Sequence, residues 1–203
     1  LNFPPVGGIL RRGGAFYIRR SFAGQPLYTA VFKTYLDVLL GKGYPVEFFP
    51  EGGRSRTGRL LKPKMGMLSM VVDSFIGQPN RKAAIVPVYI GYDKLVESGS
   101  YLKELRGKSK QKESAAGLLK ASKIFDSSYG SPYVSFGEPL VLDEALSTMQ
   151  PDWRHRLAKN DREWLPTEVT GIAQMNMSRT NDAVIVSPVG LVAGYMLSSP
   201  QHA

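Results

Sequence analysis

The sequence predicts an α/β fold, with a mixed or parallel sheet flanked by helices and a helical C-terminal part. Composition and the alternation of strand-like and helical segments support this fold class, and the cysteine and histidine counts limit the kinds of site. The 203 residues are 43% hydrophobic and 21% charged, which is ordinary for a globular protein. Apolar runs typical of strands alternate with helical patterns, as in α/β layers with right-handed crossovers. The chain has no cysteine and two histidines, so we expect neither disulfides nor a thiolate or histidine-rich metal site.

The first elements are predicted from composition and spacing. Residues 1–14 are rich in proline and glycine and are predicted to be irregular, and the aromatic run 15–18 predicts a strand. Apolar residues over 28–40 then recur at helical spacing, and two glycines at 41 and 43 provide a stop signal. A second strand is predicted over 45–49, before a loop over 50–63.

The remaining elements continue this alternation. The pattern predicts a helix over 65–76, a buried strand over 84–90, a basic helix over 103–123 and a strand over 132–136. From Asp143 onward the chain is predicted to be helical, with a connection around 151–166.

This order predicts two parts, an α/β core over 1–142 and a mainly helical segment over 143–203. Residues 183–199 are uncharged, but serine, proline and two glycines interrupt them. A bilayer span needs about 20 largely apolar residues, so we expect a buried or interfacial helix here.

The positive charge of the chain is concentrated near its start. The formal net charge is +9, and residues 1–64 contain eleven lysines and arginines against three acids. The other 139 residues contain fifteen bases and fourteen acids. An arginine-rich segment predicts a bound anion, such as phosphate, nucleic acid or an acidic membrane surface.

The loop over residues 49–58 (FPEGGRSRTG) is the most specific feature of the sequence. It follows a predicted strand, where α/β folds place their ligands. Gly52 and Gly53 allow several backbone N–H groups to face one point, and guanidinium and hydroxyl groups donate to phosphate oxygens. A surface turn with solvated arginines is the alternative. The predicted phosphate ligands are Arg54, Ser55, Arg56 and Thr57.

Two further features adjoin this site. Glu51 lies amid the arginines, and two roles stay open for it, orientation of the arginine side chains or direct catalysis. Arg19 and Arg20 form a second pair at the end of another predicted strand. If the two strands are neighbours, the arginines of both segments converge on one crevice and neutralise a phosphate dianion.

Three segments carry a resemblance to a known family. GGAFYIRRSF, FPEGGRSRTG and IVPVYIGYD resemble the second, third and fourth motifs of the bacterial membrane-associated glycerol-3-phosphate acyltransferases, in family order and spacing. The resemblance continues through YLKELRGKSKQKES, VSFGEP and PDWR and covers most of the chain. Related lysophosphatidate acyltransferases have a similar Phe-Pro-Glu-Gly loop. The Arg19-Arg20 pair and Gly53 favour the glycerol-3-phosphate branch.

The resemblance implies an acyltransferase-type α/β fold and a reaction. A fatty acyl group would pass from acyl-CoA or acyl carrier protein to the sn-1 hydroxyl of glycerol 3-phosphate, the first step of phospholipid synthesis, without a cofactor. Glu51 and Gly52 match the essential pair of the third motif, and Pro87 matches the fourth motif, on the acyl-donor side. The positions that match the family's phosphate ligands are Arg19, Arg20, Arg54 and Arg56.

One family motif does not occur in these 203 residues. The family uses His-x-x-x-x-Asp, in which the histidine is the general base. Here His155 is followed five positions later by Asn160, and His202 lies one residue before the end. The motif would precede Leu1, so we expect a fragment, truncated at the N-terminus, that binds substrate without turning it over. His155 is expected to be an ordinary surface or packing residue.

The resemblance also implies partners and a location. The implied partners are glycerol 3-phosphate, the acyl donor and an anionic membrane surface, at the cytoplasmic face of the bacterial inner membrane. The basic stretch 103–123 would be attracted to such a surface, and a solvated helix face is the alternative and commoner interpretation of that stretch. Two alternatives stay open. One is a catalytically inactive relative that binds phosphorylated lipids. The other is a nucleic-acid-binding module, which we disfavour because no such motif is recognisable and the charge lies around glycine-rich turns.

Overall fold

The computed structural model describes residues 6–19, 21–53, 55, 58–78, 81–92 and 131–198. The chain divides into two units, Leu1–Val46 and Glu47–Ala203. The predicted α/β class is confirmed, because helices accompany two pairs of strands and the C-terminal part is helical. The described pairs are antiparallel, which a mixed sheet contains and a purely parallel sheet lacks. The predicted basic helix over 103–123 lies outside the described residues, and the division at residue 142 stays a prediction.

The first unit contains the helices α1 (Val6–Arg12) and α2 (Pro26–Gly41). The helical spacing over 28–40 predicted α2 correctly. Proline suits the first turn of a helix because the N–H that it lacks has no intrahelical partner there. At the other end Gly43 has a φ of +79°. The N–H of Tyr44 donates to the carbonyl of Leu39 at 3.0 Å, which ends the helix in a Schellman motif.

Helix α1 corrects the prediction that residues 1–14 are irregular. It ends in the same way as α2, since Gly14 has a φ of +85° and the N–H of Ala15 donates to the carbonyl of Leu10 at 2.9 Å. Glycines that we interpreted as part of a loop are therefore the C-terminal stop of a short helix.

The predicted strands over 15–18 and 45–49 are wrong, because both segments are irregular. In the first segment the ring of Phe16 packs on α2 instead. The ring of Phe16 lies 6.1 Å from that of Phe32 and 5.3 Å from that of Tyr35, in an edge-on contact. Strands need a neighbour for their backbone groups, and neither segment pairs with a strand among the residues that the structure describes.

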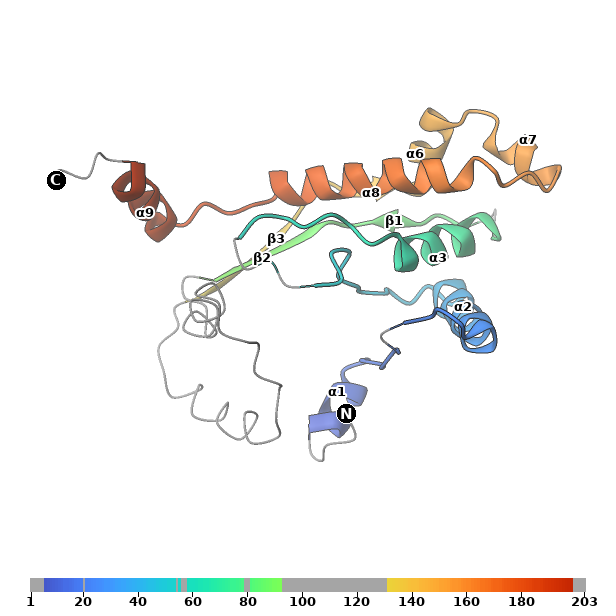
Figure 1. Cartoon of the computed structure of the whole chain (residues 1–203), viewed down its shortest axis with the longest axis horizontal. Coiled ribbons are helices and arrows are strands. Elements are labelled where there is room, and N and C mark those ends of the chain that lie inside the picture. Colours follow the sequence, from blue (N-terminus) through green and yellow to red (C-terminus); the bar gives the residue numbers. More distant parts are fainter. Residues whose placement is uncertain are drawn as a thin grey trace. The chain divides into compact units, whose positions relative to one another are not determined.

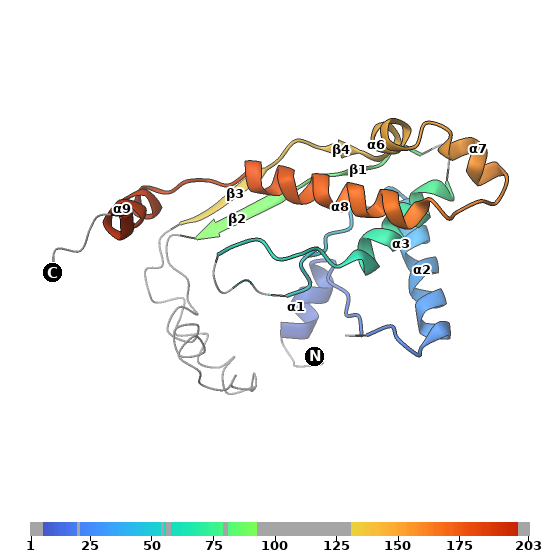
Figure 2. The same ribbon diagram turned by 45° about the horizontal axis from the view of Figure 1, so that its top comes forward.

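Four helices contribute to the core in the described part of the second unit. They are α3 (Met65–Ile76), α6 (Leu142–Met149), α7 (Trp153–Ala158) and α8 (Leu165–Asp182). Helix α3 has the bounds that the sequence predicted, and Figures 1 and 2 show it beside the long helix α8. The fully buried side chains of this core include Val72, Leu142, Leu146, Trp153 and Ile172. Each contributes about 1.5–3 kcal/mol by leaving water.

Residues 84–92 form two short strands, which corrects the single strand predicted over 84–90. Strand β1 (Ala84–Ile85) pairs with β4 (Leu140–Val141), and β2 (Val88–Tyr92) pairs with β3 (Pro132–Phe136), as predicted for 132–136. The interruption lies at the buried Pro87, which has no N–H for a ladder. Its carbonyl accepts the N–H of Gly137 at 2.8 Å, between β3 and β4.

Helix α9 (Pro188–Ser198) lies within the segment predicted as a buried or interfacial helix. None of its side chains is buried, and Leu197 is 86% exposed. The expectation of a buried helix is therefore wrong, whereas an interfacial position stays a prediction. Among the described residues, no helix combines the length and apolar character that crossing a membrane requires.

Three arginines in the helical part of this unit are paired with aspartates. The guanidinium of Arg156 donates to the carboxylate of Asp161 at 2.6 Å, just after α7. This hydrogen bond, followed by one from the N–H of Glu163, lowers the pKa of Asp161 below its ordinary value of 3.8. Two other pairs of this kind are Arg154 with Asp143 and Arg162 with Asp73.

Gly137→Ala is expected to lower the free energy of unfolding by about 1–3 kcal/mol. The new methyl group would lie 2.9 Å from the carbonyl oxygen of Arg179 and 3.2 Å from Cβ of Pro87. Urea denaturation measures the change. Gly66→Ala on α3 is the matched control, because the added carbon has no neighbour within 4 Å beyond the adjoining backbone of its own helix. An unchanged midpoint for Gly137→Ala would contradict this account of the junction.

Asp161→Asn is expected to destabilise the protein at pH 7 and not at low pH. Because folding lowers the pKa of Asp161, its contribution is present above the unfolded value near 3.8 and is lost as the pH falls through the lower folded value. Thermal unfolding of the variant and the wild-type protein at pH 7 and pH 2.5 tests this. The control is Glu47→Gln, at an exposed carboxylate outside any helix or strand. A gap between wild type and Asp161→Asn that did not shrink on acidification would refute the assignment.

Candidate functional site

The carboxylate of Glu51 closes the loop that the sequence singled out. Its Oε2 accepts the backbone N–H of Leu61 at 2.7 Å, ten residues further along the chain. A second bridge runs beside it, from the N–H of Lys64 to the carbonyl of Pro50 at 2.7 Å. The two hydrogen bonds join both ends of the loop, so Glu51 has a structural role as a backbone acceptor.

Gly52 supplies the turn at the start of the loop. Its φ is +55°, in the left-handed region that favours glycine. Its N–H donates to the carbonyl of Phe49 at 3.1 Å. A Cβ at this position would lie 2.8 Å from Cδ of Lys64, so the lysine stem covers the space that a side chain would need. Both the backbone conformation and the packing therefore favour glycine at position 52.

Ser55 is the one predicted phosphate ligand of this loop that the structure describes. Its Oγ is buried and has no hydrogen-bond partner among the described residues. A buried hydroxyl without a partner costs about 1–3 kcal/mol, and a ligand oxygen would satisfy it. Arg54, Arg56 and Thr57 lie outside the described residues.

Arg19, in the first unit, is held by two neutral side chains. Its guanidinium Nη1 donates to Oε1 of Gln25, and its guanidinium carbon lies 4.9 Å from the centre of the Tyr28 ring. Its backbone N–H also donates to the hydroxyl oxygen of Tyr28 at 3.0 Å. The side chain is exposed at the surface of its unit. Arg20 lies outside the described residues, so the predicted convergence of the arginines stays a prediction.

Pro87 is buried at the junction between the two strand pairs. Besides accepting from Gly137, it lies beside the end of α8, because a Cβ on Gly137 would meet both Pro87 and the carbonyl of Arg179. Nη1 of Arg179 donates to the carbonyls of Glu138 and Pro139. The segments IVPVYIGYD and VSFGEP thus meet at this junction, where their proline and glycine are needed for packing.

The segment PDWR has a comparable structural role. Trp153 is a core residue, 1% exposed, and its Nε1 donates to Oγ of Ser147 at 3.3 Å. The guanidinium of Arg154 lies 4.4 Å from the centre of its ring and pairs with Asp143. His155, the next residue of α7, is exposed, as expected for a surface residue.

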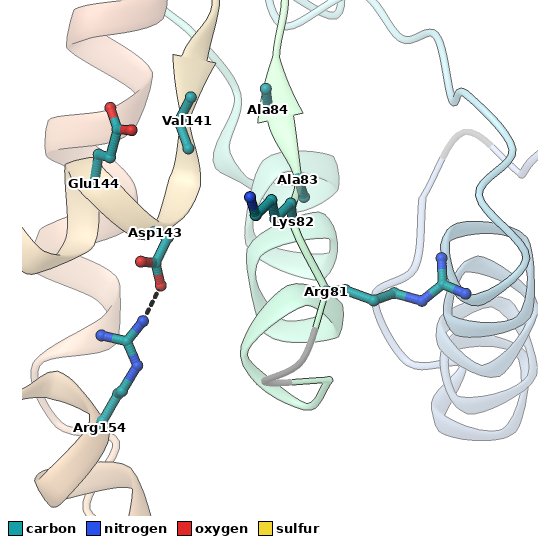
Figure 3. A pocket seen from close by; sticks show the side chains of 8 residues that line it. All are labelled: Arg81, Lys82, Ala83, Ala84, Val141, Asp143, Glu144 and Arg154. Carbon is teal, nitrogen blue, oxygen red and sulfur yellow. Dashed lines mark hydrogen bonds and ion pairs between the residues drawn. The ribbon is translucent and has the colours of Figure 1, made fainter.

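A hollow of about 600 Å³ lies elsewhere in the second unit (Figure 3). Three basic and two acidic side chains line it, and Arg154 points at Asp143 within it. None of its eight lining residues is a predicted site residue. The hollow combines charges of both signs with an internal ion pair, so it does not present a concentrated positive field.

Sequence reasoning missed the groups that hold the predicted site residues. It treated Tyr28 as a core position of a helix and gave no role to Gln25 or to the Leu61 N–H. Tyr28 follows Gln25 by three residues at the start of α2, so the two side chains face the same side. That spacing next to an arginine was the available signal. No sequence pattern indicates the contact between Glu51 and Leu61.

The chain matches two protein families and many named relatives. Residues 101–203 match the glycerol-3-phosphate acyltransferase C-terminal region, and residues 1–91 match the acyltransferase family. A glycerol-3-phosphate acyltransferase of Shewanella loihica is 49% identical over 206 residues, and one of Pseudoalteromonas atlantica is 50% identical over 208. Each alignment covers 100% of this chain and 25% of the relative. The chain therefore spans about a quarter of the length of these curated relatives.

The order of these matches agrees with the order of the motifs. The loop closed by Glu51 and the segment that holds Arg19 both fall within residues 1–91, and the helical core of α6, α7 and α8 falls within residues 101–203. The match over residues 101–203 covers half of the chain, and this establishes the family: the chain belongs to the glycerol-3-phosphate acyltransferases.

Proposed function

We propose that the protein that carries this chain transfers a fatty acyl group to the sn-1 hydroxyl of glycerol 3-phosphate. Family membership and the names of the relatives support the reaction class. The structural observation that carries the proposal is the glycine-rich loop closed by Glu51, which brackets a buried, unpartnered Ser55 hydroxyl. Such a loop offers donors to an anion, and the phosphate of glycerol 3-phosphate is one.

The reaction exchanges one acyl bond for another. The sn-1 oxygen attacks the carbonyl carbon of a thioester donor, acyl-CoA or acyl carrier protein, and forms the ester C–O bond. The C–S bond breaks, and the thiol leaves with the proton that a general base took from the hydroxyl. No electrons are gained or lost overall, so the step needs no redox cofactor.

The chain's part in this reaction is to hold the phosphate. In the proposal Arg19, Arg20, Arg54 and Arg56 neutralise it, and Ser55 donates its hydroxyl hydrogen to a phosphate oxygen. Holding the phosphate fixes the distance from the sn-1 hydroxyl to the thioester, which lowers the entropic part of the barrier. Pro87 belongs to the acyl-donor side, and Glu51 and Gly52 support the loop.

The general base of this reaction is not among the residues proposed to bind the phosphate. A His-x-x-x-x-Asp motif does not occur among the 203 residues. We therefore propose that these residues by themselves bind glycerol 3-phosphate without transferring an acyl group. A catalytically inactive relative that binds phosphorylated lipids is the second candidate. An acyl-transfer assay on the natural-length protein separates the two, since only the enzyme forms a glycerolipid ester.

The proposed setting is the cytoplasmic face of the bacterial inner membrane. The basic stretch 103–123, with seven bases and two acids, would be attracted to anionic lipid headgroups by about 1 kcal/mol per basic residue near the surface. Binding to liposomes with and without anionic lipid tests this association. The proposal assigns no nucleic acid and no metal to the protein.

Glu51→Ala is expected to weaken glycerol 3-phosphate binding about fivefold, because the Leu61 N–H loses its acceptor and the loop opens. Glu51→Gln keeps a carbonyl oxygen in the same place and is expected to retain most of the affinity. Calorimetry measures binding, and hydrogen exchange at the Leu61 amide reports loop closure. If Glu51→Gln lost as much affinity as Glu51→Ala, the negative charge rather than the hydrogen bond would be the required property.

Arg54→Ala and Arg56→Ala are each expected to weaken glycerol 3-phosphate binding about tenfold or more, the loss of a charge-assisted hydrogen bond. Titration calorimetry at constant ionic strength gives the affinities. Lys62→Ala is the matched control, since it removes one positive charge from an exposed position of the same loop. Unchanged affinity in both arginine variants would remove the phosphate assignment, as would an equal loss in the lysine variant.

A further inference from the structure

We propose that Tyr28 and Gln25 are positioning residues that orient Arg19 toward the substrate phosphate. The inference rests on the proposed function, which assigns the phosphate contact to Arg19. It adds that the guanidinium is held in place before the substrate arrives. Every contact it uses lies within the first unit.

The first step is that Arg19 is fixed at both ends. Its backbone N–H donates to the hydroxyl oxygen of Tyr28 at 3.0 Å, which sets where the side chain begins. Its guanidinium lies over the ring of the same tyrosine, at 4.9 Å, and donates to Oε1 of Gln25. An exposed arginine normally samples many rotamers, and ordering it during binding reduces affinity. Three contacts from two side chains reduce that loss in advance.

The second step is that Tyr28 is itself anchored. Its ring centre lies 5.4 Å from that of Phe22 and 6.4 Å from that of Phe32, in a stacked arrangement. Phe32 is 5% exposed, and Leu36, one turn further along α2, is fully buried. Tyr28 is therefore attached to the packed face of α2, so the position of Arg19 follows the position of this helix.

The third step concerns charge. The partners that the structure describes for Arg19 are neutral, an amide oxygen, a phenol oxygen and an aromatic ring. Arg154, Arg156 and Arg162, in the second unit, instead donate to aspartates. A carboxylate partner cancels the charge of a guanidinium, whereas an amide or a phenol orients it and leaves the charge for an anion. Neutral partners fit a side chain whose work is to attract phosphate.

A thermodynamic cycle on the natural-length protein tests this inference, with glycerol 3-phosphate affinity measured by calorimetry. Arg19→Ala is expected to weaken binding about tenfold, and Tyr28→Phe about fivefold, because phenylalanine keeps the ring and removes only the hydroxyl acceptor. In the Arg19→Ala background, Tyr28→Phe is expected to have no further effect. A merely structural tyrosine would weaken binding equally in both backgrounds.

Gln25 gives a second, independent test. Gln25→Met keeps the length of the side chain, removes its acceptor oxygen and is expected to weaken binding about threefold. Gln25→Glu keeps an acceptor but adds a negative charge, and is expected to weaken binding more than Gln25→Met does. If Gln25→Glu bound as tightly as the wild-type protein, the argument from neutral partners would be wrong.

Tyr35→Phe is the matched control. It removes a hydroxyl from the same helix and the same aromatic cluster, where the Tyr35 ring contacts Phe16 at 5.3 Å. It is expected to keep wild-type affinity. Thermal unfolding of every variant shows whether the fold persists, and the Gln25 variants test the inference should Tyr28→Phe fail to fold.

The outcomes separate this inference from the proposed function. If Arg19→Ala weakens binding while Tyr28→Phe does not, or if their effects add, the positioning role is overturned and the phosphate assignment stands. If Arg19→Ala itself leaves binding unchanged, the inference falls, and the variants at Arg54 and Arg56 decide on the phosphate site. Loss of affinity in Arg19→Ala and Tyr28→Phe with no further loss in the double variant supports the proposal.

Discussion

The backbone hydrogen bond between Pro87 and Gly137 is the contact on which the second unit depends. Proline cannot continue the strand ladder, so the chain divides into β1 and β2 at this residue, and its carbonyl turns to the N–H of Gly137. Glycine lets the backbone of α8 approach, and Arg179 then donates to the two carbonyls that follow. Both strand pairs and the longest helix of the core are thereby fixed to one point.

The two motif regions that carry the predicted phosphate ligands use a similar device. In each region, a side-chain oxygen accepts a backbone N–H close to the predicted phosphate-binding residues, and this hydrogen bond sets the local path of the chain. Glu51 accepts the N–H of Leu61 across the glycine-rich loop, and Tyr28 accepts the N–H of Arg19 beside α2. Geometry that neighbouring residues set before binding needs less ordering when a substrate arrives. Such sites are sensitive to residues that never touch the ligand.

The sequence predicted those parts of the fold in which the local pattern and the packing agree. Helix α3 and strand β3 have the predicted bounds, because α3 buries the apolar residues of its helical pattern and β3 pairs with β2 along its whole length. The strand predicted over 15–18 was wrong, because a short aromatic run fits either a strand or an irregular segment packed on a helix. Here Phe16 packs on α2. Pro87 was the available sign that 84–90 is interrupted. Of the site, the sequence indicated the loop and the arginines, whereas contacts such as Glu51 with Leu61 join positions that no periodicity relates.

The uneven charge of the chain has a physical counterpart in the way its arginines are paired. Beyond residue 64 bases and acids nearly balance, and the arginines 154, 156 and 162 each contact an aspartate, so each of these positive charges has a negative charge beside it and projects little field. Within residues 1–64 eleven bases face three acids, and the acid nearest the arginine-rich loop, Glu51, accepts a backbone N–H. An excess of positive charge attracts anions such as phosphate, and a neutral side chain such as Gln25 orients the Arg19 guanidinium without adding a negative charge beside it.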